Sequence, residues 1–418
     1  MKVSLPRAIT ALTSALDFVG IDEVHHGKRV ALMAQGIARE LGWSRDSCRE
    51  ILYAGMLHDC GVSRNREHRL LTETLEWDGA EDHCLRGEAY LLACPPLARF
   101  APLVRWHHTR WETLRQQPIA DQVRLQANLI YLADRADVLL APYFPGQSLK
   151  NEILWEYPAI TRRLAELAGS LFDPELVAAF CRAAERESFW LRMDPSYIID
   201  EIEDSFQLDA PVELNTADAL SVASLFALTV DAKSIYTLEH STRVARIARY
   251  LAEASGIRGE DLDKIEIAGL LHDIGKLRVP EDILDKPGSI NVEERAHIRR
   301  HSYDTGRILR KVFPGQPIAD WASMHHENLI GTGYPDHLSA ASIPMEARLI
   351  AVADIFHAFS QDRPYRSRMN ASEVMRRLDE FRELGKIDGE MVELVRRHAA
   401  QCYALAVAAP ADAGLAPS

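Results

Sequence analysis

The sequence predicts an all-α protein made of two helical domains related by internal duplication. Apolar residues recur at three- and four-residue steps, as in Val244, Ile247, Ala248 and Leu251, and alternating strand patterns are scarce. The 418 residues exceed the roughly 100–200 residues of a single domain, so two domains are expected. A set of metal-ligating residue types also occurs twice along the chain in the same order.

The repeat consists of histidines and aspartates at matched spacings. In each copy a lone histidine precedes a His-Asp pair by 32 residues (58−26 and 272−240), and a further histidine precedes a His-His pair by 24 residues (107−83 and 325−301). An Ala-Asp pair within an apolar segment closes each copy. Agreement at this many positions indicates a duplicated domain. The two sets are His26, His58, Asp59, His83, His107, His108 and Asp134, and His240, His272, Asp273, His301, His325, His326 and Asp354.

The domain boundary is expected near Pro195 to Asn215, where acidic and turn-forming residues interrupt the helical periodicity. We assign residues 1–205 to the first domain and 206–402 to the second. The remainder, 403–418, is rich in Ala and Pro and is predicted to be a disordered tail.

Composition limits the location and the partners of the protein. A formal net charge of −13 argues against coating of DNA or RNA, which needs a basic face, but it permits a small phosphorylated ligand. Six scattered cysteines without a CxxC pair fit a reducing cytoplasm. Because no apolar run approaches the ~20 residues of a membrane span and no signal peptide is evident, we predict a cytoplasmic protein without a membrane partner.

The second set of residues predicts a metal-dependent phosphodiesterase. Its ratio of imidazoles to carboxylates suits two divalent metals that share one carboxylate. A water between two such metals attacks phosphorus efficiently. Lys276 lies one helical turn beyond Asp273, so its ammonium can reach the same cleft.

The second half resembles the HD-GYP branch of the HD-domain phosphohydrolases from about Leu220 to Arg397. That resemblance implies hydrolysis of a cyclic dinucleotide, cyclic di-GMP or 3',3'-cyclic GMP-AMP, to a linear dinucleotide and then mononucleotides. The matching stretches are His240–Ala245, Leu271–Lys276, His325–Glu327 with Gly333–Pro335, Ala351–Asp354 and Asp362–Arg366.

The first half is similar to a degenerate member of the same superfamily. It has Val62 where the second half has Lys276, and no GYP stretch follows His107-His108-Thr109. We therefore expect a regulatory domain, whose seven repeated residues form a second candidate metal site. The tandem arrangement is similar to that of the cyclic GMP-AMP phosphodiesterases.

The resemblance also implies roles for single residues. Asp273 would bridge two Fe or Mn ions, with His240, His272 and Asp354 completing one site and His301, His325 and His326 the other. Tyr236 occupies the position of the glutamate found in three-metal members, so two metals are expected. Lys276 would assist catalysis. The residues implied in substrate binding are Lys276, Arg363, Arg366, Gly333, Tyr334 and Pro335.

Several alternatives stay open at this stage. Glu327 would either orient His326 or form a salt bridge, while Ile330 and His357 replace aspartates that are common in the family. The rivals are a non-catalytic cyclic dinucleotide receptor and an HD phosphohydrolase acting on another nucleotide. Besides the cyclic dinucleotide, a second copy of the chain or a signalling protein is the expected partner.

Overall fold

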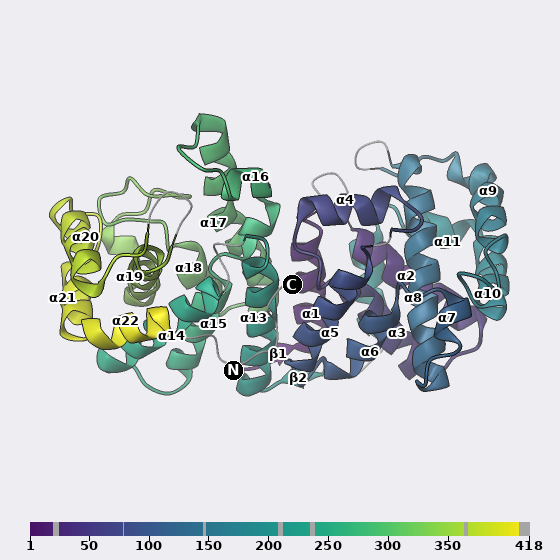
Figure 1. Ribbon diagram of the computed structural model, residues 1–418, viewed down its shortest axis with the longest axis horizontal. Helices are drawn as coiled ribbons and strands as arrows, with labels where there is room; N and C mark the ends of the chain where they lie inside the picture. The colour runs from purple at the N-terminus through teal and green to yellow at the C-terminus, as the bar shows by residue number, and fades with distance from the viewer. Residues whose placement is uncertain are drawn as a thin grey trace. The chain divides into compact units, whose positions relative to one another are not determined.

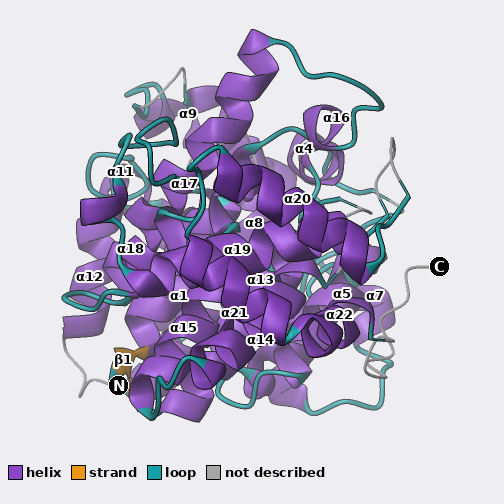
Figure 2. Ribbon diagram, turned by 90° about the vertical axis from the view of Figure 1, so that its left-hand side faces the viewer, coloured by secondary structure: helices purple, strands orange, loops and turns teal. Residues whose placement is uncertain are grey.

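The computed structural model describes residues 1–19, 25–77, 79–144, 148–207, 212–234, 239–362 and 367–408. Helices dominate these residues (Figures 1 and 2), and a two-stranded sheet pairs β1 (Val3–Ser4) with β2 (Glu213–Leu214). The chain divides into two compact units, Ser4–Val212 and Glu213–Ser418, the second of which includes Met1–Val3. The prediction of an all-α fold with two domains is confirmed.

The described residues of the N-terminal unit form twelve α-helices and two short 3₁₀ turns. Its 3₁₀ turns are η1 (Ala98–Phe100) and η2 (Ala141–Tyr143). Its helices are α1 (Leu5–Leu16), α2 (His26–Glu40), α3 (Arg45–Leu57), α4 (Asn65–Glu73), α5 (Glu81–Leu92), α6 (Ala101–Trp106), α7 (Trp111–Leu114), α8 (Asp121–Leu140), α9 (Ile153–Ala165), α10 (Pro174–Ala184), α11 (Glu187–Leu191) and α12 (Ile198–Gln207).

The C-terminal unit repeats the order of the first helices of the N-terminal unit. Its 3₁₀ turns are η3 (Ile274–Arg278) and η4 (Ala340–Ser342). Its helices are α13 (Thr216–Asp231), α14 (His240–Ala254), α15 (Glu260–Leu271), α16 (Glu281–Leu284), α17 (Val292–Val312), α18 (Ile318–Ser323), α19 (Met345–Ser360), α20 (Ala371–Glu383), α21 (Gly389–Arg397) and α22 (Ala399–Val407).

A close helix pair forms the centre of each unit. The periodic apolar residues of α2 and α14 are buried, as the spacing predicts. A β-carbon at Gly55 of α3 would lie 2.7 Å from the Cα of Ala31, and one at Gly269 of α15 would lie 2.8 Å from the Cα of Ala245. Glycine therefore lets the two helices approach closely in both units, just before each His-Asp pair.

The structure corrects the predicted boundaries. The predicted division at 205/206 falls inside α12, and the units separate between Val212 and Glu213. The prediction of disorder is wrong for 403–407, because α22 continues to Val407 and buries Cys402 and Ala406. Residues 409–418 lie outside the described part of the chain.

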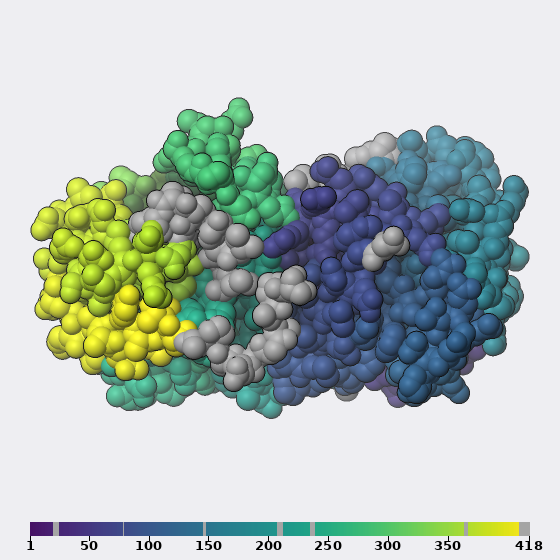
Figure 3. Space-filling view, in the orientation of Figure 1, coloured from purple at the N-terminus to yellow at the C-terminus, as the bar shows by residue number. Residues whose placement is uncertain are grey.

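The first turns of α17 project from the rest of the C-terminal unit (Figure 3, green). Val292, the first residue of this helix, is 85% exposed, whereas His301 further along is buried. An asparagine and a glutamate cap the exposed end reciprocally, because Asn291 accepts from the Glu294 N–H and Glu294 accepts from the Asn291 N–H. Among the described helices, none combines the length and apolar character that crossing a membrane requires.

Candidate active site

The seven repeated residues of the second half converge at the centre of the C-terminal unit. Five helices supply them: the start of α14, the end of α15, the middle of α17 and of α19, and the turn after α18. Five of these side chains are buried to 98% or more, those of His240, His272, Asp273, His301 and His325. We call this set the C-terminal cluster: His240, His272, Asp273, His301, His325, His326 and Asp354.

Asp273 lies between two groups of histidines. Its Oδ2 is 3.5 Å from His240 Nε2 and 3.3 Å from His272 Nε2. Its Oδ1 is 3.4 Å from His301 Nε2 and 3.7 Å from His325 Nε2. One carboxylate therefore presents a separate oxygen to each histidine pair, which is the arrangement that two bridged metals require.

Hydrogen bonds orient the imidazoles toward the centre of the cluster. The Nδ1 atoms of His272, His301 and His325 each lie 2.5 to 2.7 Å from a backbone carbonyl oxygen three residues earlier. Because a carbonyl only accepts, each Nδ1 donates, and this contact directs each Nε2 toward the centre of the cluster. His240 differs, since its Nδ1 lies 2.8 Å from Nδ1 of another imidazole, that of His357.

The residues present fit divalent metals. His240 Nε2, His272 Nε2 and Asp273 Oδ1 are buried and make no hydrogen bond to the residues that the structure describes. Burial alone would raise the pKa of Asp273, but the charges of His272 and Lys276 hold that pKa well below its usual value. An ionised carboxylate beside imidazole nitrogens that make no hydrogen bond is a ligand set for cations. Ligand atoms of His301, His325 and His326 also lie within 4.8 Å of one another.

Lys276 reaches the cluster from the 3₁₀ turn η3. Its Nζ donates to Asp273 Oδ2 at 2.6 Å, and 20% of the side chain is exposed. Gly275 makes this turn possible, because a β-carbon there would overlap the backbone carbonyl of His301. The ammonium group is therefore fixed at the edge of the cluster, where it can contact both the carboxylate and a bound anion.

The GYP loop packs directly against the cluster. The Tyr334 ring lies 4.8 Å from the His326 ring, and the Arg299 guanidinium lies 4.8 Å from the Tyr334 ring centre. Gly331 adopts a φ of 73°, and a β-carbon at Gly333 would lie 2.5 Å from the Cα of Glu327. The loop thus uses Tyr334 and Gly333 for packing on residues of the site.

Glu327 differs from both sequence-based alternatives. Its carboxylate accepts hydrogen bonds from the backbone N–H groups of Asp336 at 2.7 Å and Leu338 at 2.9 Å. Within the described residues, it therefore holds the backbone after the GYP motif, and it neither orients His326 nor pairs with a cation. Sequence could not show this, because the partners are backbone amides that any residue type carries.

The first set of repeated residues converges in the same way in the N-terminal unit. Asp59 Oδ2 lies 3.6 Å from His26 Nε2 and 3.3 Å from His58 Nε2, while its Oδ1 lies 3.4 Å from His83 Nε2. His108 Nε2 lies 3.6 Å from Asp134 Oδ2. Buried His58 Nε2 and Asp59 Oδ1 make no hydrogen bond within the described residues. The N-terminal cluster is His26, His58, Asp59, His83, His107, His108 and Asp134.

Charged partners distinguish the N-terminal cluster. Buried Arg135 donates to Asp134 Oδ2 at 2.7 Å, so a guanidinium already occupies one oxygen of this carboxylate. His26 Nδ1 contacts Asp137 Oδ2 at 2.7 Å, where His240 contacts the imidazole of His357. Arg29 also pairs with Asp137.

Two stretches of the chain, residues 24–139 and 227–391, match the HD domain family model. The chain is 37% identical over 410 residues to the 3'3'-cGAMP-specific phosphodiesterase 1 of Vibrio cholerae, a match that covers 97% of this chain and 94% of that relative. The chain belongs to the HD-GYP branch of the HD-domain phosphohydrolases. The family predicted from the motifs is confirmed.

Other HD-GYP relatives match a part of the chain or its fold. The cyclic di-GMP phosphodiesterase PA4108 of Pseudomonas aeruginosa is 39% identical over 149 residues, covering 35% of this chain and 36% of that relative. The crystal structure of a cyclic GMP-AMP specific phosphodiesterase from V. cholerae superposes with a TM-score of 0.63 at 24% identity. That match covers 96% of this chain and 98% of the other, and it shows that the tandem HD fold is shared.

Some residues singled out in the sequence lie outside the described part of the chain, and the sequence did not predict some contacts. Arg363, Arg366 and Tyr236 lie outside the described residues. The contact of Arg135 with Asp134 was not predicted. The second copy has Ile355 in place of Arg135. A residue-by-residue comparison of the two copies could have indicated this difference.

Proposed function

We propose that this chain is a metal-dependent phosphodiesterase that opens a 3',5'-cyclic dinucleotide, cyclic di-GMP or 3',3'-cyclic GMP-AMP, to a linear dinucleotide and then mononucleotides. The observation that carries the proposal is the buried carboxylate of Asp273, whose two oxygens face two different histidine pairs. The names of the relatives support this substrate class. The relative matched over nearly the whole chain makes 3',3'-cyclic GMP-AMP the first substrate to test.

Seven residues would hold two divalent metals, Fe or Mn, in the C-terminal cluster. Asp273 would be shared, with His240, His272 and Asp354 on one side and His301, His325 and His326 on the other. Such metals, when bound, supply a Lewis acid for the phosphodiester and an acidified water as nucleophile. Two groups of ligand atoms within 4.8 Å of one another support this division, His240 with His272 and Asp273, and His301 with His325 and His326. A third group joins His325 to His272 and Asp354, so His325 lies close to both sides.

Protein groups bind the phosphodiester and stabilise its developing charge. Asp273 stays ionised, because nearby positive charge holds its pKa well below the usual value despite burial. The Lys276 ammonium, which contacts Asp273 in this structure, is placed to bind a phosphate oxygen and to stabilise charge on the leaving oxygen. Gly333, Tyr334 and Pro335 would border the substrate, and Arg363 and Arg366 stay predicted phosphate contacts.

The N-terminal domain would serve regulation instead of cyclic dinucleotide hydrolysis. It keeps the seven ligand positions, and we propose that it can hold metal. Val62 supplies no ammonium, and Arg135 competes for Asp134. A cytoplasmic location, and a second copy of the chain or a signalling protein as partner, stay predictions.

The decisive test is anaerobic turnover of Mn(II)- or Fe(II)-loaded protein on cyclic di-GMP and 3',3'-cyclic GMP-AMP in parallel. We expect cleavage of at least one substrate, and its loss in the His272→Ala/Asp273→Ala variant. Binding of both compounds without product, at full metal occupancy, would instead support a receptor.

A further inference from the structure

Arg299 lies beside the GYP loop and has no carboxylate partner among the described residues. It belongs to α17, two positions before a histidine of the C-terminal cluster, and its side chain is half-buried. Other arginines of this helix are paired. Arg300 lies 3.3 Å from Asp304, and Arg310 lies 3.0 Å from Asp320. The guanidinium of Arg299 instead lies over an aromatic ring, and its N–H groups make no hydrogen bond within the described part of the chain.

The ring of Tyr334 holds this guanidinium beside the C-terminal cluster. The guanidinium carbon lies 4.8 Å from the centre of the Tyr334 ring, a distance at which a cation is attracted to the face of an aromatic ring. The same ring lies 4.8 Å from that of His326. Because Tyr334 contacts both side chains, the positive charge of Arg299 borders the place where the substrate would bind.

The chemistry of the substrate supplies a partner for this charge. A cyclic dinucleotide carries two phosphodiester groups, and each bears a negative charge. The proposed metals and Lys276 would act on the group that is cleaved, so the second group still needs a cation among the described residues. A guanidinium stays charged and offers five N–H donors in a planar fork that fits two phosphate oxygens. Arg299 is therefore equipped to bind the second group.

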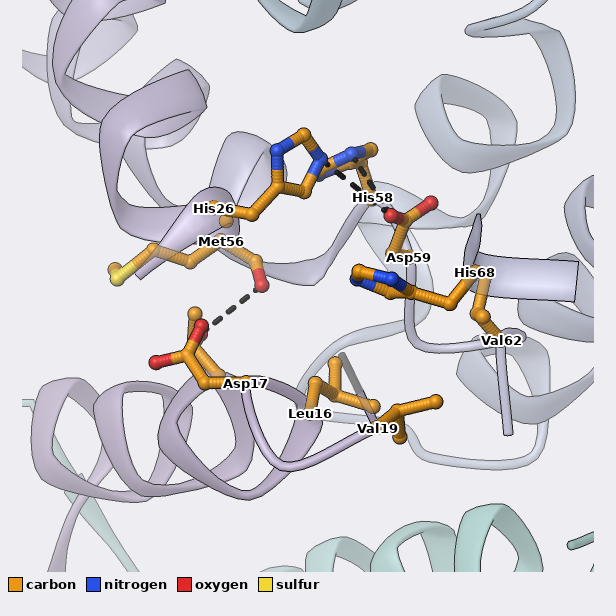
Figure 4. A pocket seen from close by; sticks show the side chains of 11 residues that line it. Leu16, Asp17, Val19, His26, Met56, His58, Asp59, Val62 and His68 are labelled. Atoms are coloured by element: carbon orange, nitrogen blue, oxygen red, sulfur yellow. Dashed lines mark hydrogen bonds and ion pairs between the residues drawn. The ribbon is translucent and has the colours of Figure 1, made fainter. Parts of the chain in front are cut away.

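The N-terminal cluster lacks a counterpart of this arginine. The residue two positions before His83 is Glu81, which accepts a hydrogen bond from Arg105 at 2.7 Å. The pocket beside this cluster is lined by carboxylates, histidines and apolar side chains (Figure 4). As far as the chain is described, that lining includes neither lysine nor arginine. The unpaired arginine thus belongs to the cluster for which we propose catalysis.

We propose that Arg299 binds the phosphodiester of the substrate that is not being cleaved. The inference rests on the cyclic dinucleotide hydrolysis proposed above and adds a substrate-binding residue to that site. Tyr334 would orient the guanidinium by stacking on it. Because this contact lies away from the reacting phosphorus, it is as strong in the bound substrate as in the transition state. Its loss should therefore raise KM and leave kcat nearly unchanged.

The test compares two kinds of substrate on the Mn(II)-loaded full-length chain. The two candidate cyclic dinucleotides carry two phosphodiesters, whereas bis(4-nitrophenyl) phosphate carries one. Steady-state kinetics are measured for the unaltered chain, for Arg299→Ala and for Arg299→Lys, which keeps the charge. Arg307→Ala, at an exposed arginine of the same helix, is the control. Elemental analysis gives the Mn(II) content of each variant.

We expect Arg299→Ala to raise KM for the cyclic dinucleotide about tenfold, because a hydrogen bond between two charged groups is lost. KM for bis(4-nitrophenyl) phosphate and the Mn(II) content should not change, and Arg299→Lys should restore part of the affinity. Arg307→Ala should behave like the unaltered chain.

An unchanged KM for the cyclic dinucleotide in Arg299→Ala, or an equal loss with both kinds of substrate, would overturn the inference and leave the proposed function standing. An equal loss would show that the arginine only supports the fold of the GYP loop. Cleavage of neither compound by the unaltered chain would contradict the proposed function, and this inference with it.

Discussion

The two histidine-aspartate clusters share the geometry of their ligand residues, but the residues that surround the ligands differ. In both, a central aspartate presents one oxygen to the first two histidines and the other to the third, at 3.3 to 3.6 Å. The C-terminal cluster adds the Lys276 ammonium and the GYP loop. The N-terminal cluster adds Arg135 on its last aspartate and a carboxylate behind His26. We infer from this comparison that the residues around the ligands would decide which cluster is catalytic.

Buried charge is also balanced differently in the two units. Asp17 and Asp231 occupy matching positions, yet Asp17 pairs with the buried ammonium of Lys28, whereas Asp231 accepts hydrogen bonds from the N–H and hydroxyl of Ser241. Within the described residues, the N-terminal unit thus has buried ion pairs around its cluster. Such pairs fix the local structure, while the C-terminal cluster keeps a lysine at its edge for an anion.

The largest expected effect comes from removing the lysine. Lys276→Ala should lower kcat by about 10²–10³-fold, because a preorganised donor to the developing charge is lost. Metal content should not fall, since Lys276 is not a ligand. Steady-state kinetics with 3',3'-cyclic GMP-AMP, and Lys311→Ala as an exposed control, would check this. Unchanged kcat in Lys276→Ala would remove the main difference we draw between the clusters.

The next largest effect is expected from Asp17→Asn on the stability of the N-terminal unit. Burial alone would raise the pKa of Asp17, but the charges of Lys28 and His25 lower it to about 2. A folded-state pKa below the unfolded value gives stability that is present above about pH 4 and is lost as the pH falls through 2. Asp17→Asn should therefore destabilise this unit by about 3 kcal/mol at pH 7, and by much less near pH 2.

The matched variant Asp231→Asn should behave in the opposite way. Burial raises the pKa of Asp231 to about 8, so the unaltered protein loses stability as the pH rises from about 4 through 8. The asparagine variant does not ionise, and it should be at least as stable as the unaltered protein at pH 8. Calorimetric unfolding of both variants across this pH range would reveal the contrast, and parallel behaviour would refute it.

A smaller effect, on metal affinity, is expected from changing His357, which contacts Nδ1 of His240. His357→Asp would give His240 the carboxylate partner that Asp137 gives His26, and a carboxylate raises the basicity of a ligand imidazole. Mn(II) should bind about tenfold more tightly, as measured by competition with a chelator. Asp137→His should weaken metal retention in the N-terminal cluster correspondingly. Weaker binding in His357→Asp would show that the imidazole pair is the better support.

The sequence predicted the fold because apolar residues recur with helical periodicity, and it predicted both sets of converging residues because their spacing repeats between the two halves. It also identified His357 as a departure from the family, but not its contact with His240, which joins residues 117 apart in the chain. The role of Glu327 depends on backbone amides, and that of Arg135 on a pairing between a buried guanidinium and its neighbour. Such contacts carry no periodic signal, so they emerged only from the three-dimensional arrangement.

The central claim is that one cluster hydrolyses the cyclic dinucleotide and the other does not. Its most direct test is turnover of 3',3'-cyclic GMP-AMP by Mn(II)-loaded Asp273→Asn and Asp59→Asn, the matched substitutions of the shared aspartates. We predict a loss of at least about 10³-fold in Asp273→Asn and a change of less than about threefold in Asp59→Asn. Equal losses in the two variants, or turnover that survives Asp273→Asn, would contradict the account.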